Sequence, residues 1–585
     1  MPVQPRPYAA LPLIWAAIIL LLTLTPAADM PRTPTWELLS FDTAAHAAVF
    51  GLLAALAWFW ARRQRRWPRL ARRPAGPLLA ACLLFGGLIE LLQHTMHQGR
   101  HGEWSDLLSD GLGAALALLS LAGLRRWQAS RAATIAVLAL FASATTAPAQ
   151  RVEPDTARAR CTIKALASPK MHGRGYVQNG DKIAAEYLRK RLRKLKLEPL
   201  APNYTQPFAL DVNTFPGKMQ ASYQLDVPSG MNCISYEWEA GRDFIAEPGS
   251  GGGTVRGRLH PLDTAIFSNP QVRQWYQRQP FQDQILWLRQ ATAKRLPELP
   301  LPLRQHLDSA AAWITVVPKL TASVSNAQRQ HLRIEVLETK IPQFNVVSER
   351  YGAVTVTPDN GYIRATIRLD AQLQRNYPTQ NLAAVVRGTA QPDSFLVVSA
   401  HYDHLGMMGK DVYFPGANDN ASGVALLLEL AAHYARPENR PACSVVFLLF
   451  GAEEAGLLGS QYFAQHPLVP LRRIKFLVNL DLLGTGEQGA TIVNGRVHEA
   501  AYRWLTSLNE ARHYLPALAP RGRAANSDHY PFSELGVPAF FLYTRGGSPA
   551  YHDVHDVPAA LSLAGFAGAF GLVRDFLDAL GARPE

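Results

Sequence analysis

The sequence predicts an α/β fold, with a mostly parallel sheet flanked by helices, preceded by an all-α transmembrane domain. Three observations lead to this prediction. Residues 1–150 of the 585-residue chain are rich in Ala and Leu and hold several long apolar runs. Beyond residue 380, short apolar runs rich in β-branched residues alternate with helical stretches, which is typical of a parallel sheet covered on both faces. Less regular residues lie between these two parts.

Four apolar runs in the N-terminal part are long enough, or nearly so, to cross a bilayer core, which takes about 20 residues. They cover residues 10–28, 43–61, 76–95 and 105–124. The Arg-rich loop at residues 62–73 is expected to stay in the cytoplasm, because basic loops remain on that side. We therefore predict a four-helix transmembrane domain over residues 1–130 that contacts membrane lipid.

The net charge of +13 comes partly from this Arg-rich loop. No motif with interleaved basic and aromatic residues accompanies it, so we expect no nucleic-acid partner. The four cysteines lack the close spacing of a zinc-binding Cys motif and do not predict a disulfide framework.

Residues 131–150 have a basic start, a short apolar core and the small-residue end Ala147-Pro148-Ala149. This is the layout of a secretory signal peptide, although it lies inside the chain. It is a fifth transmembrane segment, a signal that is cut after Ala149, or the junction of two wrongly joined genes. The first two alternatives place residues 151–585 outside the cytoplasm. We expect a bacterial-type inner-membrane protein with this part on the periplasmic or extracellular side.

Polar residues recur within or beside the predicted spans. They are Asp42, His46, Glu90, Gln93, Arg100, Asp106 and Asp110. Ionisable groups at membrane depth are costly and usually pair or serve a site, unless they are merely wetted at the interface. Their order resembles the VanZ-like membrane family over about residues 10–125, except that Asp110 stands where Asn is expected. That family implies a membrane protein linked to glycopeptide-antibiotic tolerance, and we assign no reaction to this part.

The C-terminal part begins with residues 155–200, whose apolar positions recur at three- and four-residue spacing and predict helix. We expect residues 205–345 to form an inserted or lid-like subdomain within the domain of residues 151–585. Beyond residue 380, five apolar runs predict strands, namely NLAAVVRG, SFLVVSAHYD, CSVVFLLFGAEE, RIKFLVNLDLLG and VPAFFLYT. Ligands bind at the carboxyl ends of strands in open α/β sheets, so the residues that follow these runs are candidate site residues.

Histidine and acidic side chains follow these predicted strands or the turns between them. They are His401, Asp403, Asp419, Glu453, Glu454, Asp481, His552 and Asp556. Each alone is more often a cap or a surface residue, but so many coincidences are not expected by chance. Buried carboxylates are costly unless they are paired or bind a metal. Two imidazoles with several carboxylates and no Cys suit zinc, with cobalt or manganese as alternatives.

These residues lie in the motifs H-Y-D, G-A-N-D-N-A-S-G, A-E-E-x-G-x-x-G-S, N-x-D and Y-H-x-x-x-D. The motifs and their order resemble the co-catalytic dizinc aminopeptidases of clan MH, family 28, over about residues 155–200 and 345–580. The segment MHGRG, from Met171 to Gly175, also resembles the start of that family. The resemblance implies a zinc-aminopeptidase-type fold, two zinc ions and peptide substrates.

The resemblance further implies which residues hold the metals. His401 and Asp481 would hold one ion, and Glu454 and His552 the other. Asp419 would bridge both ions, and a cis peptide bond would follow it.

Two further acidic residues would support the ligands. The resemblance implies that Asp403 orients His401 through the distal N–H of the ring, and that Asp556 does the same for His552.

The remaining roles concern the reaction. The resemblance makes Glu453 the general base that moves a proton from water to the leaving amine. Tyr551 would stabilise the oxyanion. Asp528 and His529 lie in a segment that would shape the substrate pocket.

The predicted function is a membrane-linked, exported metallopeptidase that removes N-terminal residues from peptides with dizinc-activated water. Two alternatives stay open. A glutaminyl cyclase on the same fold would use one zinc ion, and a binding protein on the same fold would catalyse nothing. The complete ligand set together with Glu453 favours the peptidase.

Overall fold

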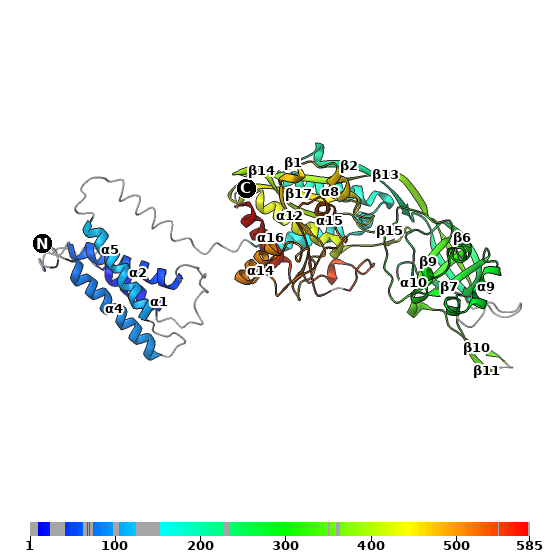
Figure 1. The fold of residues 1–585 in the computed structure, drawn as a ribbon, viewed down its shortest axis with the longest axis horizontal. Helices are drawn as coiled ribbons and strands as arrows, with labels where there is room; N and C mark the ends of the chain where they lie inside the picture. Colours follow the sequence, from blue (N-terminus) through cyan, green and yellow to red (C-terminus); the bar gives the residue numbers. More distant parts are fainter. Residues whose placement is uncertain are drawn as a thin grey trace. The chain divides into compact units, whose positions relative to one another are not determined.

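The computed structural model of the chain divides into two compact units, residues 1–150 and residues 151–585 (Figure 1). It describes residues 10–23, 41–62, 67, 70, 74–96, 104–123, 153–225, 235–348, 352–358, 363–547 and 549–582. The signal-like segment 131–150 and most of the Arg-rich loop lie outside the described residues, so those predictions stay predictions.

Four helices make up the described part of the first unit. They are α1 (Leu11–Thr23), α2 (Phe41–Arg62), α4 (Ala75–Met96) and α5 (Trp104–Gly123). Each lies over most of one of the four apolar runs. The stretch Ala75–Leu92 of α4 is long and apolar enough to cross a membrane, and the apolar stretches of the other three helices are shorter. Four membrane spans therefore stay a prediction.

The helices of the first unit pack through small residues and leave apolar side chains outside. A Cβ atom on Gly113 of α5 would lie 1.9 Å from the carbonyl oxygen of Ala47, so glycine allows α2 and α5 to approach closely. On the outer surface, Leu84, Leu108 and Leu119 are 76%, 75% and 69% exposed. The described outer surface of this bundle therefore carries large apolar side chains.

One pair among the polar residues of the predicted spans meets inside the bundle. His46 Nδ1 lies 3.0 Å from Asp110 Oδ1, and Asp110 is buried. The side chains of Asp42, Gln93, Arg100 and Asp106 lie outside the described part of the chain.

A nine-stranded main sheet is the centre of residues 151–585. Its order is β1-β13-β17-β14-β18-β21-β19-β20, and β2 pairs with β13. The strands are β1 (Glu198–Pro199), β2 (Thr205–Thr214), β13 (Gln372–Val386), β14 (Gln391–His401), β17 (Cys443–Phe450), β18 (Ile474–Leu480), β19 (Ala490–Val493), β20 (Leu518–Pro520) and β21 (Ala539–Thr544). The central strands β17, β14, β18 and β21 are parallel. The pairs made by β13, and the pair β19–β21, are antiparallel, so the sheet is mixed rather than mostly parallel.

Helices cover both faces of the main sheet. They are α7 (Thr156–Leu166), α8 (Gly180–Lys194), α12 (Gly423–Tyr434), α13 (Leu458–Gln465), α14 (Glu499–Arg512), α15 (His529–Glu534) and α16 (Phe566–Gly581). One core joins α7, α8, α12, α14 and α16 to the sheet, and a second core joins α13 and α15 to its other face. The central strands are buried on both sides, which explains their unbroken apolar sequences.

Helix α7 belongs to the first of these cores. Ala159, Ile163 and Leu166 of α7 are buried there. Its Arg158 Nε donates to Glu429 Oε1 of α12 at 2.7 Å, and Glu429 is buried. The start of the second unit is thus fastened to its centre by apolar packing and by an ion pair.

A second sheet of eight strands lies between β2 and β13 in the chain. Its order is β4-β3-β12-β6-β7-β8-β9-β5. The strands are β3 (Met219–Leu225), β4 (Ser235–Trp238), β5 (Phe244–Ala246), β6 (Gly253–Pro261), β7 (Gln284–Arg289), β8 (Ala312–Val317), β9 (Leu332–Leu337) and β12 (Ile363–Leu369). Helices α9 (Pro270–Arg278), α10 (Gln290–Arg295) and α11 (Leu301–Leu307) accompany it. Two short hairpins complete the described strands, β10 (Phe344–Ser348) with β11 (Gly352–Val356) and β15 (Met407–Met408) with β16 (Val412–Tyr413).

The second sheet corrects the predicted bounds of the inserted subdomain. Residues 205–214 form β2, which pairs with β13 in the main sheet. The second sheet continues to Leu369, because β12 pairs with both β3 and β6. We refer to residues 219–369 as the inserted domain. Bounds of 205–345 were wrong at both ends because strand pairing between distant segments leaves no local sequence signal.

Candidate metal centre

The central parallel strands bring the candidate ligands to one edge of the main sheet. His401 is the last residue of β14 and pairs with Phe450, the last residue of β17. Glu453 and Glu454 follow β17, and Asp481 follows β18 directly. Because parallel strands present their carboxyl ends at the same edge, these side chains converge.

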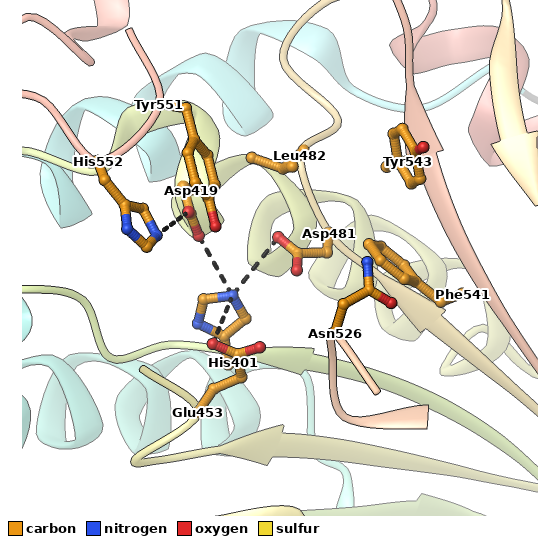
Figure 2. A pocket seen from close by; sticks show the side chains of 10 residues that line it. All are labelled: His401, Asp419, Glu453, Asp481, Leu482, Asn526, Phe541, Tyr543, Tyr551 and His552. Atoms are coloured by element: carbon orange, nitrogen blue, oxygen red, sulfur yellow. Dashed lines mark ion pairs between the residues drawn. The ribbon is translucent and has the colours of Figure 1, made fainter. Parts of the chain in front are cut away.

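Two further side chains reach this edge from loops. Asp419 lies in the π-helical turn Ala417–Ser422 that leads into α12, and its peptide bond to Asn420 is cis, as the resemblance implied. His552 lies on the loop after β21. Figure 2 shows Asp419 between His401 and His552, with one carboxylate oxygen toward each.

The first group of ligand atoms surrounds His401. Its Nε2 lies 3.3 Å from Asp419 Oδ1 and 3.4 Å from Asp481 Oδ1. Glu453 Oε2 lies 4.0 Å from the same nitrogen. The side chain of His401 is 1% exposed.

The second group surrounds His552. Its Nε2 lies 3.2 Å from Asp419 Oδ2 and 3.2 Å from Glu454 Oε2. His404 also lies near this group, with Nδ1 2.7 Å from Glu454 Oε1. His404 thus contacts Oε1 of Glu454 and His552 contacts Oε2, and potential ligand atoms of His404, Asp419 and Glu454 lie within 4.8 Å of one another.

These separations fit two metal ions. Neighbouring ligand atoms of a tetrahedral zinc site with bonds of about 2.0–2.1 Å lie about 3.3 Å apart. The four distances from the two imidazoles to Asp419, Asp481 and Glu454 all lie between 3.2 and 3.4 Å. The donor set of imidazole and carboxylate also suits zinc, cobalt or manganese. The residues present therefore fit a dinuclear centre bridged by Asp419.

Asp403 lies beside the distal nitrogen of His401, as predicted, but Asp556 supports the centre differently. His401 Nδ1 is 3.3 Å from the main-chain oxygen of Asp403 and 3.8 Å from its Oδ1, and the carboxylate of Asp403 also accepts from the backbone N–H groups of Glu453 and Glu454. The carboxylate of Asp556 accepts from the N–H groups of Asn418 and Asp419.

The partner of the distal nitrogen of His552 is therefore not Asp556. His552 Nδ1 lies 2.9 Å from the carbonyl oxygen of Ala322, a residue of the inserted domain. The prediction for Asp556 was wrong in this respect, because a backbone carbonyl from a distant segment takes the role.

Arg174 of the MHGRG segment binds the backbone of the two loops that carry His401 and Asp419. Its guanidinium is fully buried and donates to the carbonyl oxygens of Tyr402, Gly416 and Asp419, at 2.8, 2.7 and 3.1 Å. It also donates to the carbonyl oxygen of Pro415 at 2.7 Å. The buried Arg174 thus connects the segments that follow His401 and precede α12, a role that sequence reasoning missed although it noted the motif.

The carboxylates make the site strongly attractive to cations. Burial alone would lower the pKa of His552, but the charge of Glu454 and contacts with Asp419 raise it to about 11. Burial raises the pKa of Glu454, but His552 and His404 outweigh this effect and lower the pKa to about 2. Such opposite shifts arise because negative charge is concentrated in a dry site, which divalent ions would neutralise.

Glu453 differs from its neighbour Glu454. Burial raises the pKa of Glu453 well above its usual range, and the charges of Asp528 and Glu454 raise it further. A carboxyl group that lies beside the ligand atoms and holds its proton more tightly than usual is suited to general acid–base chemistry.

A cavity of about 210 Å³ opens beside the ligands (Figure 2). Besides His401, Asp419, Glu453, Asp481 and His552, its walls are formed by Leu482, Asn526, Phe541, Tyr543 and Tyr551. The ring of Tyr551 stacks on that of His552, with centroids 3.9 Å apart. Tyr551 therefore lies at the wall of the cavity next to the candidate ligands, and its role toward the oxyanion stays a prediction.

Asp528 and His529 are fully buried and are not among the residues that line this cavity. Their segment contributes Asn526 to the wall instead, and Ser527 Oγ donates to Asp481 Oδ2 at 3.0 Å. His529 packs behind Phe541, with ring centroids 5.5 Å apart. The segment shapes the pocket, but mainly through neighbours of the two predicted residues.

Comparison with known proteins agrees with this geometry. Residues 381–577 match the model of Peptidase family M28. The matched residues include all five candidate ligands.

Curated relatives match parts of the chain. An aminopeptidase named YwaD from Bacillus subtilis is 32% identical over 203 residues, which are 33% of this chain and 42% of the relative. A probable zinc metalloprotease from Pyricularia oryzae is 41% identical over 113 residues, which are 19% of this chain and 22% of the relative. The chain thus spans less than half the length of either relative.

A solved structure also resembles the fold. The zinc aminopeptidase BSAP from Bacillus subtilis is 19% identical, with a TM-score of 0.50 over 73% of this chain and 95% of that chain. This likeness supports the fold of residues 151–585.

Proposed function

We propose that residues 151–585 are a dizinc metallo-aminopeptidase that removes N-terminal residues from peptides. The observation that carries this proposal is the double contact of Asp419, whose two carboxylate oxygens lie 3.3 and 3.2 Å from His401 and His552. The names of the curated relatives, an aminopeptidase and a zinc metalloprotease, support it.

The residues of the chain have defined roles in this reaction. Bound zinc ions would supply Lewis acidity that polarises the scissile carbonyl and acidifies water. Glu453 takes a proton from the attacking water and delivers it to the amine nitrogen as the C–N bond breaks. The hydroxyl of Tyr551 donates a hydrogen bond to the oxyanion that forms on the carbonyl.

The size of the cavity favours an exopeptidase. A volume of about 210 Å³ is below the usual range for ligand pockets, about 300–1,000 Å³, and is suited to one terminal residue rather than a continuous chain. The wall residues Leu482, Phe541 and Tyr543 would contact the side chain of that residue.

The test is zinc analysis of the purified full chain, followed by a screen with an N-terminal peptide library. We expect about two zinc ions per chain and release of single N-terminal residues. One zinc ion with cyclisation of N-terminal glutamine would favour the glutaminyl cyclase. Two zinc ions without any cleavage would favour a binding protein.

The proposed location is the bacterial-type inner membrane, with residues 151–585 outside the cytoplasm. The apolar outer surface of α1, α2, α4 and α5 and the Arg-rich loop support membrane insertion. Protease added to intact spheroplasts should digest residues 151–585. Resistance of this part in intact spheroplasts, with digestion after lysis, would place it in the cytoplasm instead.

A further inference from the structure

A short segment of the inserted domain lies against the loop that carries His552. This segment, Lys319–Ala322, follows β8. The N–H of Ala322 donates to the carbonyl oxygen of His552 at 3.1 Å, and His552 Nδ1 lies 2.9 Å from the carbonyl oxygen of Ala322. Both the backbone and the side chain of His552 are thus paired with one residue of the inserted domain.

Lys319 fastens the same loop a few residues earlier. Its Nζ donates to the carbonyl oxygen of Pro549 at 2.6 Å and to that of Tyr551 at 3.1 Å. The ammonium group therefore holds the backbone on which Tyr551 enters the cavity.

Apolar packing continues these attachments on both sides. Val554, two residues after His552, packs against the core of the inserted domain. Val324, two residues after Ala322, packs in the cluster that contains Ala452 and Ala455, which flank Glu453 and Glu454. The segment Lys319–Ala322 and the residues just after it are therefore packed near the loops that carry His552 and Glu454.

His552 depends on such support. Its φ is 54°, in the left-handed region that non-glycine residues seldom adopt, so outside contacts must maintain this backbone. A hydrogen bond from Nδ1–H to a carbonyl also fixes the tautomer that leaves Nε2 free to bind a metal. In this chain the carbonyl belongs to Ala322, since Asp556 binds the backbone of Asn418 and Asp419 instead.

We propose that Lys319 and Ala322 are positioning residues of the second metal position, so that the inserted domain is a structural part of the metal centre. This inference rests on the proposed function, because it requires that Glu454 and His552 bind a metal ion. Coupling between sites is reciprocal, so zinc binding should in turn stabilise the segment Lys319–Ala322.

The first experiment measures zinc binding by calorimetry to the purified, chelator-treated full chain. Lys319→Met should weaken the affinity for the zinc ion at Glu454 and His552 about tenfold. The affinity for the ion at His401 and Asp481, which we expect to be the tighter one, should stay unchanged. Lys319→Arg should recover most of this loss, because a guanidinium also donates to carbonyl oxygens. The control is Lys294→Met, which changes an exposed lysine of α10 in the same domain. Unchanged binding of both ions by Lys319→Met would overturn the role of Lys319.

The second experiment needs no variant and follows amide hydrogen exchange with and without zinc. Amides in residues 318–325 should exchange faster after zinc removal, together with those of residues 549–556. A change confined to residues 416–423 and 549–556 would overturn the coupling. A wild-type chain that binds no zinc would instead overturn the proposed function. Two bound zinc ions with neither effect would overturn this inference alone.

Discussion

The main sheet and the second sheet both place four parallel strands side by side, yet the site lies at only one of them. In the main sheet these are β17, β14, β18 and β21, and in the second sheet they are β6, β7, β8 and β9. Charged residues follow the strands in both. Arg289 at the end of β7 and Glu338 after β9 form an ion pair of 2.7 Å.

The difference lies in burial. The side chains of Arg289 and Glu338 are 45% and 54% exposed, so water solvates each of them without help. The side chains of His401, Asp419 and Asp481 are at most 8% exposed, and several negative charges share the space around them. A charged residue at a strand end therefore contributes to a binding site when the protein shields it from water and places several other charged groups close to it.

The largest effect is expected at Glu453. Glu453→Gln removes the proton acceptor and keeps its shape, so kcat should fall about 10²–10⁴-fold while zinc content stays near that of the wild type. Peptide hydrolysis assays with parallel zinc analysis check this. Normal turnover would show that another group moves the proton.

The next effect tests how Asp556 acts. Asp556→Ala removes the acceptor for the N–H groups of Asn418 and Asp419, so zinc affinity should fall about 10–100-fold. The matched control is His555→Ala, which alters an exposed neighbour and should bind zinc as the wild type does. Equal affinities of the two variants would remove Asp556 from the metal centre.

A smaller effect, on stability, is expected at Glu335 in the second sheet, where the carboxyl group is partly buried. Burial raises the pKa of Glu335 to about 7 from 4.5, and Glu247 adds to the shift. The folded state then binds a proton that the unfolded state has lost, so stability falls as pH rises from about 5 to above 7.

Glu335→Gln should therefore match the wild type at pH 5 and be more stable by about 2 kcal/mol at pH 8, with allowance for partial solvent screening. Urea unfolding followed by tryptophan fluorescence suits this measurement, because Trp287 and Trp313 are buried in the inserted domain. A stability difference that is equal at both pH values would contradict the shift.

The smallest effect is expected at the exposed ion pair. Arg289→Met should change the free energy of unfolding by less than about 1 kcal/mol, because exposed pairs gain little over hydration. The same fluorescence measurement at low and high salt checks this. A loss of several kcal/mol would mean that the strand ends of the two sheets differ less than their exposure indicates.

The strands that carry the ligands could be predicted because their sequences are apolar throughout. All five predicted runs became strands, as β13, β14, β17, β18 and β21. The other four strands of the main sheet, β1, β2, β19 and β20, were missed, because they lack the long apolar runs of the central strands. The antiparallel pairs could not be foreseen either, since strand direction depends on distant segments.

The candidate site shows the same division. His401, Asp419, Glu454, Asp481 and His552 could be proposed because imidazoles and carboxylates after strands leave a visible signal. The role of Ala322 could not, because a carbonyl oxygen is common to every residue and only the fold selects one. Asp556 was noticed for its charge, but its partner was wrong for the same reason.

The packing of α7 has a consequence for how the protein could mature. The described core of residues 151–585 begins at Ala159, and Arg158 Nε donates to Glu429 Oε1. A processing cut after Ala149 would therefore remove none of the side chains buried in that core. A shed enzyme and its membrane-held precursor should then melt at the same temperature and show the same turnover number.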